Sequence, residues 1–195
     1  PPRGRAAIDR PNILMIMTDQ HHAACVGYRN VELKWRATVH GEGGLRKGLA
    51  AYYGLISLID WNIGRILEQL DRRGLRDSTI IVFCADHGDF AGEYGRMAKG
   101  YPYDALHRVP FVWAWPGRFR ENDVKAGFAS NVDFAPTVCD LVGVPIPRSM
   151  QGQSLVQALT TDADTISYRS LTLTADKRQK DEASLPEPDF KGPLA

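Results

Sequence analysis

Hydrophobic residues along this chain form two short unbroken runs and one long periodic stripe. Asn12–Thr18 (NILMIMT) and Thr79–Ala85 (TIIVFCA) are runs of the kind that forms strands buried on both faces of a sheet. Between them, Leu49–Arg73 carries apolar residues at three- and four-residue spacing, which predicts an amphipathic helix stopped by Gly74. A long helix that feeds a buried strand is typical of one crossover in a parallel α/β sheet. The stripe consists of Leu49, Tyr52, Tyr53, Ile56, Ile59, Ile63, Ile66, Leu67 and Leu70. We expect Tyr53, Ile56, Ile63 and Leu67 to pack on that sheet.

Three further elements are expected in the second half of the chain. Phe111–Trp115 is an apolar segment with prolines on both sides, and it predicts a third strand. Ser130–Asp133 has the pattern of a capping box, which predicts a helix over Phe134–Val142. A short helical piece is expected between Gly152 and Leu159.

Polar segments frame and interrupt these elements. Residues 1–11 are basic and marked by proline, and we expect them to be a flexible lead-in. Val31–Gly48 is polar and glycine-rich without a clear period, which predicts a loop. Residues 160–195 are polar and charged with clustered prolines, so a loosely ordered tail is expected. The sequence therefore predicts one α/β domain over residues 12–159.

Composition narrows the class of protein but does not identify a partner. The 195 residues are 44% hydrophobic and 24% charged, which is ordinary for a soluble globular domain. A formal net charge of +1 gives no argument for a nucleic-acid partner. No apolar run approaches the ~20 residues of a membrane span, and no signal-peptide core is visible. The default expectation is therefore a cytoplasmic protein without a membrane span.

Polar side chains that suit a metal ion follow both unbroken apolar runs. Asp86 and His87 come directly after the second run, and Asp19 and Gln20 directly after the first. The carboxyl ends of parallel strands meet at one edge of a sheet, where ligands bind. Oxygen ligands together with an imidazole suit a divalent cation. The simpler alternatives are a polar turn at Asp86-His87 and a helix cap at Asp19-Gln20.

With both clusters in view, the chain resembles the sulfatase family of the alkaline-phosphatase-like superfamily. Each matching motif is weak by itself, but together they occur in family order. They are Pro11-Asn12-Ile13-Leu14, Thr18-Asp19-Gln20, Tyr52-Tyr53, Asp60, Gly64, Thr79, Asp86-His87-Gly88, Gly92, Gly95, Lys99, Arg108-Val109-Pro110, Pro116-Gly117, Asp133, Pro136-Thr137, Gly143 and Gly152-x-Ser154-Leu155.

This resemblance implies a fold, a cofactor and a class of substrate. The expected fold is a truncated α/β domain with a mixed, largely parallel sheet sandwiched by helices. Asp19, Gln20, Asp86 and His87 match the family's four protein ligands of one divalent cation. Calcium is favoured, with Mg²⁺ or Mn²⁺ as alternatives. Lys99 matches the lysine that contacts the sulfate group. The expected substrate is a small-molecule or carbohydrate sulfate ester.

The chain departs from the family pattern in the segment that carries the nucleophile. Family members have a Cys-x-Pro-x-Arg or Ser-x-Pro-x-Arg motif, whose first residue becomes formylglycine. Here Cys25–Arg29 keeps the spacing but lacks the proline, so an ordinary loop is favoured over a relocated nucleophile. Three hypotheses follow: a sulfatase in complete or incomplete form, an inactive metal-binding or structural remnant, and a related phosphonate or phosphate monoester hydrolase.

Overall fold

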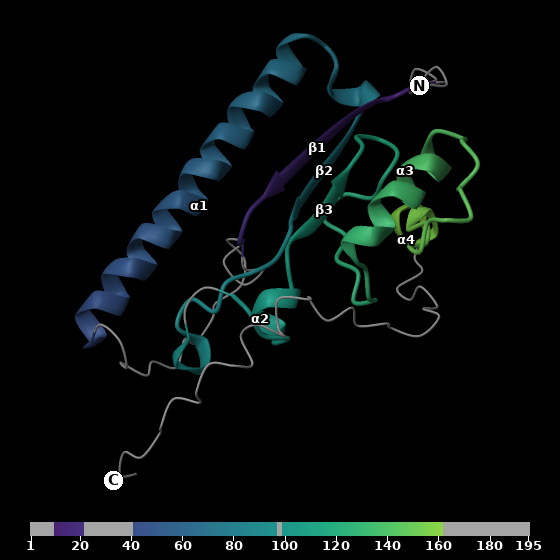
Figure 1. The fold of residues 1–195 in the computed structure, drawn as a ribbon. Helices are drawn as coiled ribbons and strands as arrows, with labels where there is room; N and C mark the ends of the chain where they lie inside the picture. The colour runs from purple at the N-terminus through teal and green to yellow at the C-terminus, as the bar shows by residue number, and fades with distance from the viewer. Residues whose placement is uncertain (1–9, 22–40, 97–98, 162–195) are drawn as a thin grey trace.

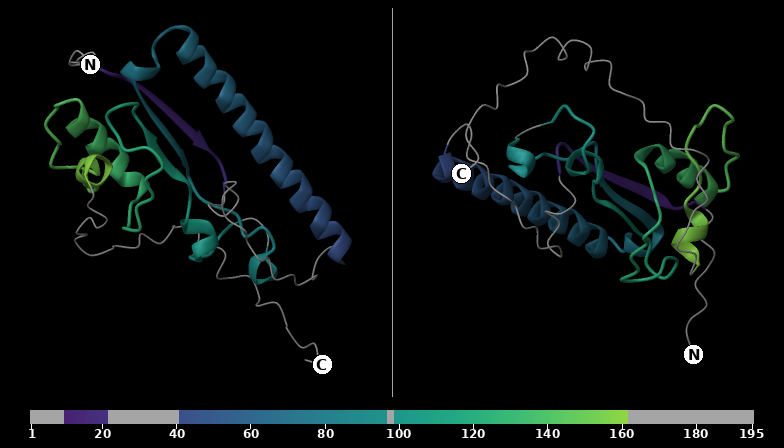
Figure 2. Two further views of the ribbon diagram at one scale, coloured as in Figure 1. Left: turned by 180° about the vertical axis from the view of Figure 1, so that it is seen from behind. Right: turned by 90° about the horizontal axis from the view of Figure 1, so that it is seen from below.

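A three-stranded mixed sheet with helices on both sides forms the centre of the molecule (Figures 1 and 2). The computed structural model describes residues 10–21, 41–96 and 99–161. The expected lead-in and tail therefore lie almost entirely outside the described residues. In chain order the elements are β1 (Asn12–Thr18), α1 (Gly41–Arg72), the short 3-10 helix η2 (Arg76–Ser78), β2 (Thr79–Ala85), η3 (Glu93–Gly95), α2 (Asp104–His107), β3 (Phe111–Ala114), η4 (Asn131–Asp133), α3 (Phe134–Leu141) and α4 (Val156–Thr160).

The two apolar runs pair as parallel neighbours, as predicted. The register runs from Asn12 opposite Thr79 to Thr18 opposite Ala85, so the two strands end level with each other. Strand β3 pairs with the other edge of β2 in the antiparallel direction. The strand order is therefore β1-β2-β3, and β2 lies in the middle.

Strand β2 is buried on both faces, whereas β1 is not. Residues that are partners in the register point to the same face of a sheet, so Ile13, Met15 and Met17 share a face with Ile80, Val82 and Cys84. The three β1 side chains remain exposed, while their β2 partners are buried. The expectation that β1 is buried on both faces is therefore wrong for this face, because within the described residues α3 and α4 reach only β2 and β3.

The principal core lies between the sheet and the second half of the chain. Ile80 and Val82 of β2 are fully buried there with Trp115 and Phe119. Partly buried aromatic and leucine side chains complete this cluster: Phe111, Trp113, Phe134, Leu141 and Leu159. Figure 1 shows α3 and α4 on this side of the sheet, and α1 on the opposite side.

Helix α1 begins earlier than the sequence predicts. It starts at Gly41 rather than Leu49, so the last part of the expected loop over Val31–Gly48 is helical. The first part of that loop lies outside the described residues. Leu45, which is partly buried, lies one turn before buried Leu49, so the apolar stripe continues into the extension despite its glycines. The opposite end stops as predicted, with Gly74 at φ 64° and a backbone bond from Leu75 N to Leu70 O of 2.9 Å.

The apolar stripe of α1 is only partly buried. Ile56, Ile63 and Leu67 are half-buried, while Tyr53 and Ile66 at the margins of the stripe are exposed. The expectation that Tyr53 packs on the sheet is therefore wrong. Among the helices of the described residues, none has the length and apolar character that a membrane crossing requires.

The later elements follow the sequence closely. The third strand forms at Phe111–Ala114. The capping box is present: the Ser130 backbone N–H donates a hydrogen bond to Asp133 Oδ2, and the Ser130 side chain accepts one from the backbone N–H of Asp133. The final helical piece starts at Val156 rather than near Gly152. Gly152 instead lies so close to the Val132 carbonyl that a Cβ would approach it to 2.1 Å.

The register supplies a matched pair of substitutions that tests the asymmetry between β1 and β2. Ile80→Ala should lower the free energy of unfolding by about 2–5 kcal/mol, because it opens a cavity at a fully buried site. Its register partner Ile13 is 43% exposed, and Ile13→Ala should cost less than about 1 kcal/mol. Urea unfolding of both variants measures the difference, and equal losses would show that the exposed face of β1 is covered in solution.

Candidate metal centre

The residues that follow β1 and β2 meet at one end of the sheet. The parallel pairing brings the two carboxyl ends level, and Asp86 N continues the ladder by donating to Thr18 O at 3.2 Å. In Figure 1 both strands run toward the end of the sheet where α2 lies. Any side chain that immediately follows either strand is therefore close to the other.

Two carboxylates and an imidazole converge at this end. Asp19, Asp86 and His87 each offer one ligand atom, and these atoms all lie within 4.8 Å of one another. His87 Nε2 is 3.4 Å from Asp19 Oδ1 and 3.3 Å from Asp86 Oδ2. This donor set and spacing fit a divalent cation, which binds carboxylate oxygens and neutral imidazole nitrogen.

The His87 ring is oriented by its own backbone. Its Nδ1 lies 2.8 Å from the carbonyl oxygen of Gly88. Because a carbonyl can only accept, Nδ1 carries the proton of this bond, which leaves the lone pair of a neutral ring on Nε2. Nε2 is the atom that faces Asp19 and Asp86, so the tautomer suits a metal ligand.

Asp86 is held in its ionised form by backbone donors. Partial burial by itself would raise its pKa, but hydrogen bonds from the backbone N–H groups of Gln20 and His87 outweigh that effect. The nearby His87 and Lys99 side chains act in the same direction, and the pKa of Asp86 lies below its usual value. The two N–H groups lie 3.0 Å and 2.7 Å from Asp86 Oδ1. Asp86 therefore presents an anionic carboxylate at neutral pH.

Gln20 contacts this cluster through its backbone, and its side chain turns to a residue that the sequence analysis missed. The Gln20 side-chain amide donates to the carboxylate of Asp89, which is buried. Gln20 itself adopts φ 59°, an uncommon conformation for a non-glycine residue. The hydroxyl of Tyr52 on α1 donates to Gln20 O at 2.7 Å and fixes this turn from the helix side. A second acidic residue in Asp86-His87-Gly88-Asp89 was the signal that could have indicated the role of Asp89.

Lys99 joins the same cluster from a separate loop. Its ammonium nitrogen lies 2.6 Å from His87 Nε2, although the two residues belong to different segments. All five of the residues named from the sequence, or their backbone atoms, are therefore within one local network. The positive charge of Lys99 lies beside the candidate ligands, where an anionic group bound to a cation would also lie.

Gly88 allows the turn that carries Asp86 and His87 to pack against α2. Its N–H donates to Leu106 O at 2.8 Å, and a Cβ built on it would lie 2.0 Å from Ala105 O. Real Cβ atoms do not approach a backbone oxygen so closely, so only glycine fits without moving α2. The glycine of the Asp-His-Gly motif thus fixes the position of the two side chains before it.

The cysteines in the described residues do not offer a nucleophile at this site. Cys84 is buried in β2, and burial, followed by the charge of Asp86, raises the pKa of its thiol. Cys139 lies on α3, on the far side of the sheet from α1. Cys25, the alternative nucleophile considered from the sequence, lies outside the described residues.

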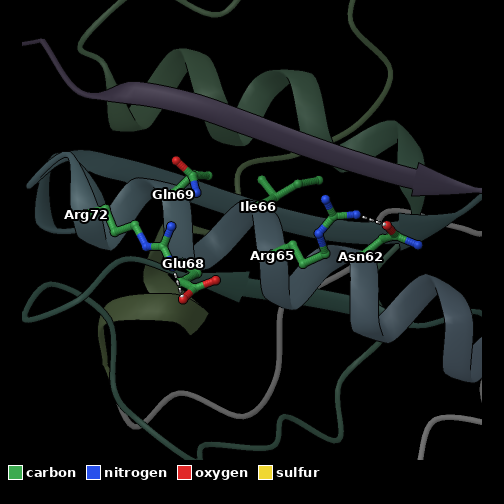
Figure 3. A pocket seen from close by; sticks show the side chains of 6 residues that line it. All are labelled: Asn62, Arg65, Ile66, Glu68, Gln69 and Arg72. Atoms are coloured by element: carbon green, nitrogen blue, oxygen red, sulfur yellow. Dashed lines mark hydrogen bonds and ion pairs between the residues drawn. The ribbon is translucent and has the colours of Figure 1, made fainter.

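A surface hollow of about 470 Å³ lies elsewhere, along the carboxyl-terminal half of α1 (Figure 3). Its charged side chains are already paired, with Arg72 2.7 Å from Glu68 and Arg65 3.3 Å from Asn62 Oδ1. It lies toward the end of α1 that is remote from the carboxyl ends of the strands, so it is not part of the candidate centre. Its lining residues are Asn62, Arg65, Ile66, Glu68, Gln69 and Arg72.

The fold and the strand-end cluster define an α/β protein with a candidate metal centre, and comparison with known proteins specifies its family. The sulfatase family model matches residues 4–144. An N-acetylglucosamine-6-O-sulfatase of Bacteroides thetaiotaomicron is 34% identical over 138 residues, which cover 71% of this chain and 24% of that protein. This chain belongs to the sulfatase family.

Solved structures agree on the fold. A protein in complex with its substrate D-glucosamine-2-N,6-O-disulfate is 36% identical with a TM-score of 0.57, covering 60% of this chain and 24% of that one. A phosphonate monoester hydrolase from Silicibacter pomeroyi is 31% identical with a TM-score of 0.61, covering 70% and 28%. The expected alkaline-phosphatase-like α/β fold is confirmed, and the chain spans about a quarter of the length of these relatives.

The packing of Gly88 gives a direct test of how the centre is positioned. Gly88→Ala should lower the free energy of unfolding by at least about 1–3 kcal/mol, because the new Cβ overlaps the Ala105 carbonyl. Gly64→Ala is the matched control: apart from the nearby backbone of α1 itself, no atom lies within 4 Å of its Cβ position, so stability should be unchanged or rise by up to about 1 kcal/mol. Thermal and urea unfolding measure both. A Gly88→Ala variant as stable as its parent would contradict the close packing of this turn on α2.

Proposed function

We propose that this chain binds one divalent cation through Asp19, Gln20, Asp86 and His87, and that it forms the cation-binding part of a sulfuric ester hydrolase. The observation that carries the proposal is the convergence of Asp19, Asp86 and His87 within 4.8 Å at the ends of two parallel strands. Membership of the sulfatase family supports the reaction class. Gln20 enters as a ligand through the family resemblance, and its side chain would have to turn from Asp89 toward the cation.

Calcium is the favoured cation. Two ligands of one ion can be separated by at most twice the metal–ligand distance, which is about 5 Å for Ca²⁺ and about 4 Å for Mg²⁺. The ligand atoms of Asp19, Asp86 and His87 lie within 4.8 Å of one another, which fits the span around Ca²⁺ and is a looser fit to the shorter span around Mg²⁺. Mn²⁺ remains an alternative because its donor preferences overlap.

The residues around the centre suit an anionic tetrahedral group. A bound divalent cation would stabilise the negative charge that develops on the oxygens of a sulfate ester. Lys99 would hold the same group with its ammonium, which already lies beside His87. Asp86 stays ionised because of its backbone donors, and His87 keeps its Nε2 lone pair toward the centre.

The proposed substrate is a carbohydrate or small-molecule sulfate ester. The similar proteins include an N-acetylglucosamine-6-O-sulfatase and a protein solved with a disulfated glucosamine. A phosphonate monoester hydrolase is a second candidate function, because a solved enzyme of that kind is 31% identical. Sulfate and phosphonate esters share their tetrahedral charge distribution, so the relative affinities of this chain for a sulfate ester and a phosphonate ester would separate the two functions.

Cation binding is tested by removing one carboxylate charge. Asp86→Asn should weaken Ca²⁺ binding by at least about tenfold, since it neutralises one of the converging ligands. Asp60→Asn, which changes an exposed carboxylate on α1, is the matched control and should bind Ca²⁺ as tightly as the parent does. Isothermal titration calorimetry of the metal-free chain with CaCl₂ measures the dissociation constant. Equal affinities of the two variants would refute the centre.

Turnover should be absent or very low in this 195-residue chain, because it lacks the Cys-x-Pro-x-Arg or Ser-x-Pro-x-Arg motif whose first residue becomes formylglycine in the family. Hydrolysis of 4-nitrophenyl sulfate provides the assay, with Cys25→Ala as the decisive variant. Robust turnover that disappears in Cys25→Ala would overturn this expectation and make Cys25 the nucleophile. Turnover that survives Cys25→Ala but is lost in Asp86→Asn would point instead to water activated at the cation.

A further inference from the structure

Four aromatic rings from two segments gather beside the candidate metal centre. The Phe90 ring lies next to all three tyrosine rings: its centroid is 5.5 Å from that of Tyr103, 6.4 Å from that of Tyr101 and 6.5 Å from that of Tyr94. Tyr94 and Tyr103 are closest, at 4.8 Å. Phe90 is 1% exposed, whereas Tyr94, Tyr101 and Tyr103 are 65%, 45% and 38% exposed. We call the three exposed rings the tyrosine platform.

The tyrosine platform packs on buried Phe90, and the turn that carries Tyr94 has an uncommon backbone conformation. Phe90 packs with Ala105 and Leu106 of α2 in a small core of its own. Ala91 and Tyr94 adopt φ 47° and 54°, which is unfavourable for residues other than glycine. The turn is closed by a bond from Gly92 N to Arg96 O of 2.9 Å. Strained positions that persist in a supported loop are typical of ligand sites.

The tyrosine platform borders the proposed sulfate position. Phe90 follows His87 closely in sequence, and Leu106 beneath it also receives the N–H of Gly88. Lys99, whose ammonium lies 2.6 Å from His87 Nε2, directly precedes the segment with Tyr101 and Tyr103. These contacts place the tyrosine platform in the segments that adjoin His87 and Lys99, next to the position proposed for the charged group of the substrate.

The charges around the tyrosine platform indicate what kind of group it accepts. The Arg96 guanidinium carbon lies 4.2 Å from the centre of the Tyr101 ring, and Lys99 adds a second positive charge nearby. Tyrosine faces attract cations in general, but here the Arg96 guanidinium already lies over the Tyr101 ring, and its charge would repel a second cation. A neutral ring with polarised C–H bonds and hydroxyl groups suits the negative ring faces and the tyrosine hydroxyls better.

We propose that Tyr94, Tyr101 and Tyr103 bind the sugar ring of a carbohydrate sulfate ester whose sulfate group lies at Lys99. This proposal rests on the proposed function and specifies its substrate class. The platform determines which ester is bound, while Asp19, Asp86, His87 and Lys99 hold the charged end.

Binding of three probes to the full 195-residue chain tests the proposal. Glucose 6-sulfate, inorganic sulfate and methyl glucoside are titrated in the presence of Ca²⁺ and followed by saturation-transfer NMR. Tyr94→Ala should weaken glucose 6-sulfate and methyl glucoside binding by about three- to tenfold and leave inorganic sulfate unchanged. Tyr94→Phe keeps the ring and should retain most of the affinity. Tyr53→Ala removes an exposed tyrosine from α1 and should change none of the three.

Two further controls test that the variants are folded and that the sulfate group binds at Lys99. Tyr103→Ala, at a residue with an ordinary backbone conformation, should repeat the effect of Tyr94→Ala, and circular dichroism melting confirms that each variant is folded. Lys99→Ala should weaken both sulfate-containing probes but not methyl glucoside. If the unsubstituted chain binds methyl glucoside but neither inorganic sulfate nor Ca²⁺, the proposed function is refuted, while sugar binding by the tyrosines is not.

Three results would overturn the sugar site. The first is unchanged affinity for glucose 6-sulfate in both Tyr94→Ala and Tyr103→Ala. The second is tighter binding of choline sulfate than of glucose 6-sulfate, with loss of that preference in Tyr94→Ala, which would make the platform a site for a quaternary ammonium. The third is a larger loss of affinity for 4-nitrophenyl sulfate than for glucose 6-sulfate in Tyr94→Ala, which would show that the platform binds aryl groups.

Discussion

The parallel pairing of β1 with β2 is the constraint on which the rest of this structure depends. It aligns Thr18 with Ala85, so the residues after each strand begin at the same level. Asp19 and Asp86 are far apart in the sequence, yet no long side chain or flexible loop is needed to bring them together. Their convergence with His87 follows from the register, and a shift by one residue would turn each side chain to the other face of the sheet.

The same end of the sheet is stabilised by contacts in addition to those among Asp19, Asp86 and His87. Gly88 packs on α2, Tyr52 of α1 holds the turn at Gln20, and Asp89 is buried where it receives the Gln20 amide. These contacts leave little freedom for the two strand-end turns. Asp86 and His87 are therefore held in place before a cation binds, which lowers the entropic cost of assembling the site, whereas the Gln20 side chain would have to turn from Asp89.

Exposed apolar residues gather on β1 and α1 within the described part of the chain. Ile13, Met15 and Met17 line one face of β1 without cover from the described residues, and Trp61 on α1 is exposed as well. The core that does form lies around β2, α3 and α4. Apolar burial is therefore concentrated on β2 and the elements that follow it, while the apolar side chains of α1 and β1 are largely half-buried or exposed.

The sequence by itself determined the features that depend on local pattern. Unbroken apolar runs specified β1 and β2, Gly74 specified the end of α1, Ser130 and Asp133 specified the start of the α3 region, and strand-end chemistry indicated Asp19, Gln20, Asp86 and His87. Tertiary structure alone decided the start of α1, the exposure of one face of β1, the contact of Asp89 with Gln20 and the gathering of the tyrosine rings. Each of these depends on which distant segments meet, because burial and side-chain contacts are set by packing between elements and leave no period or spacing in the sequence.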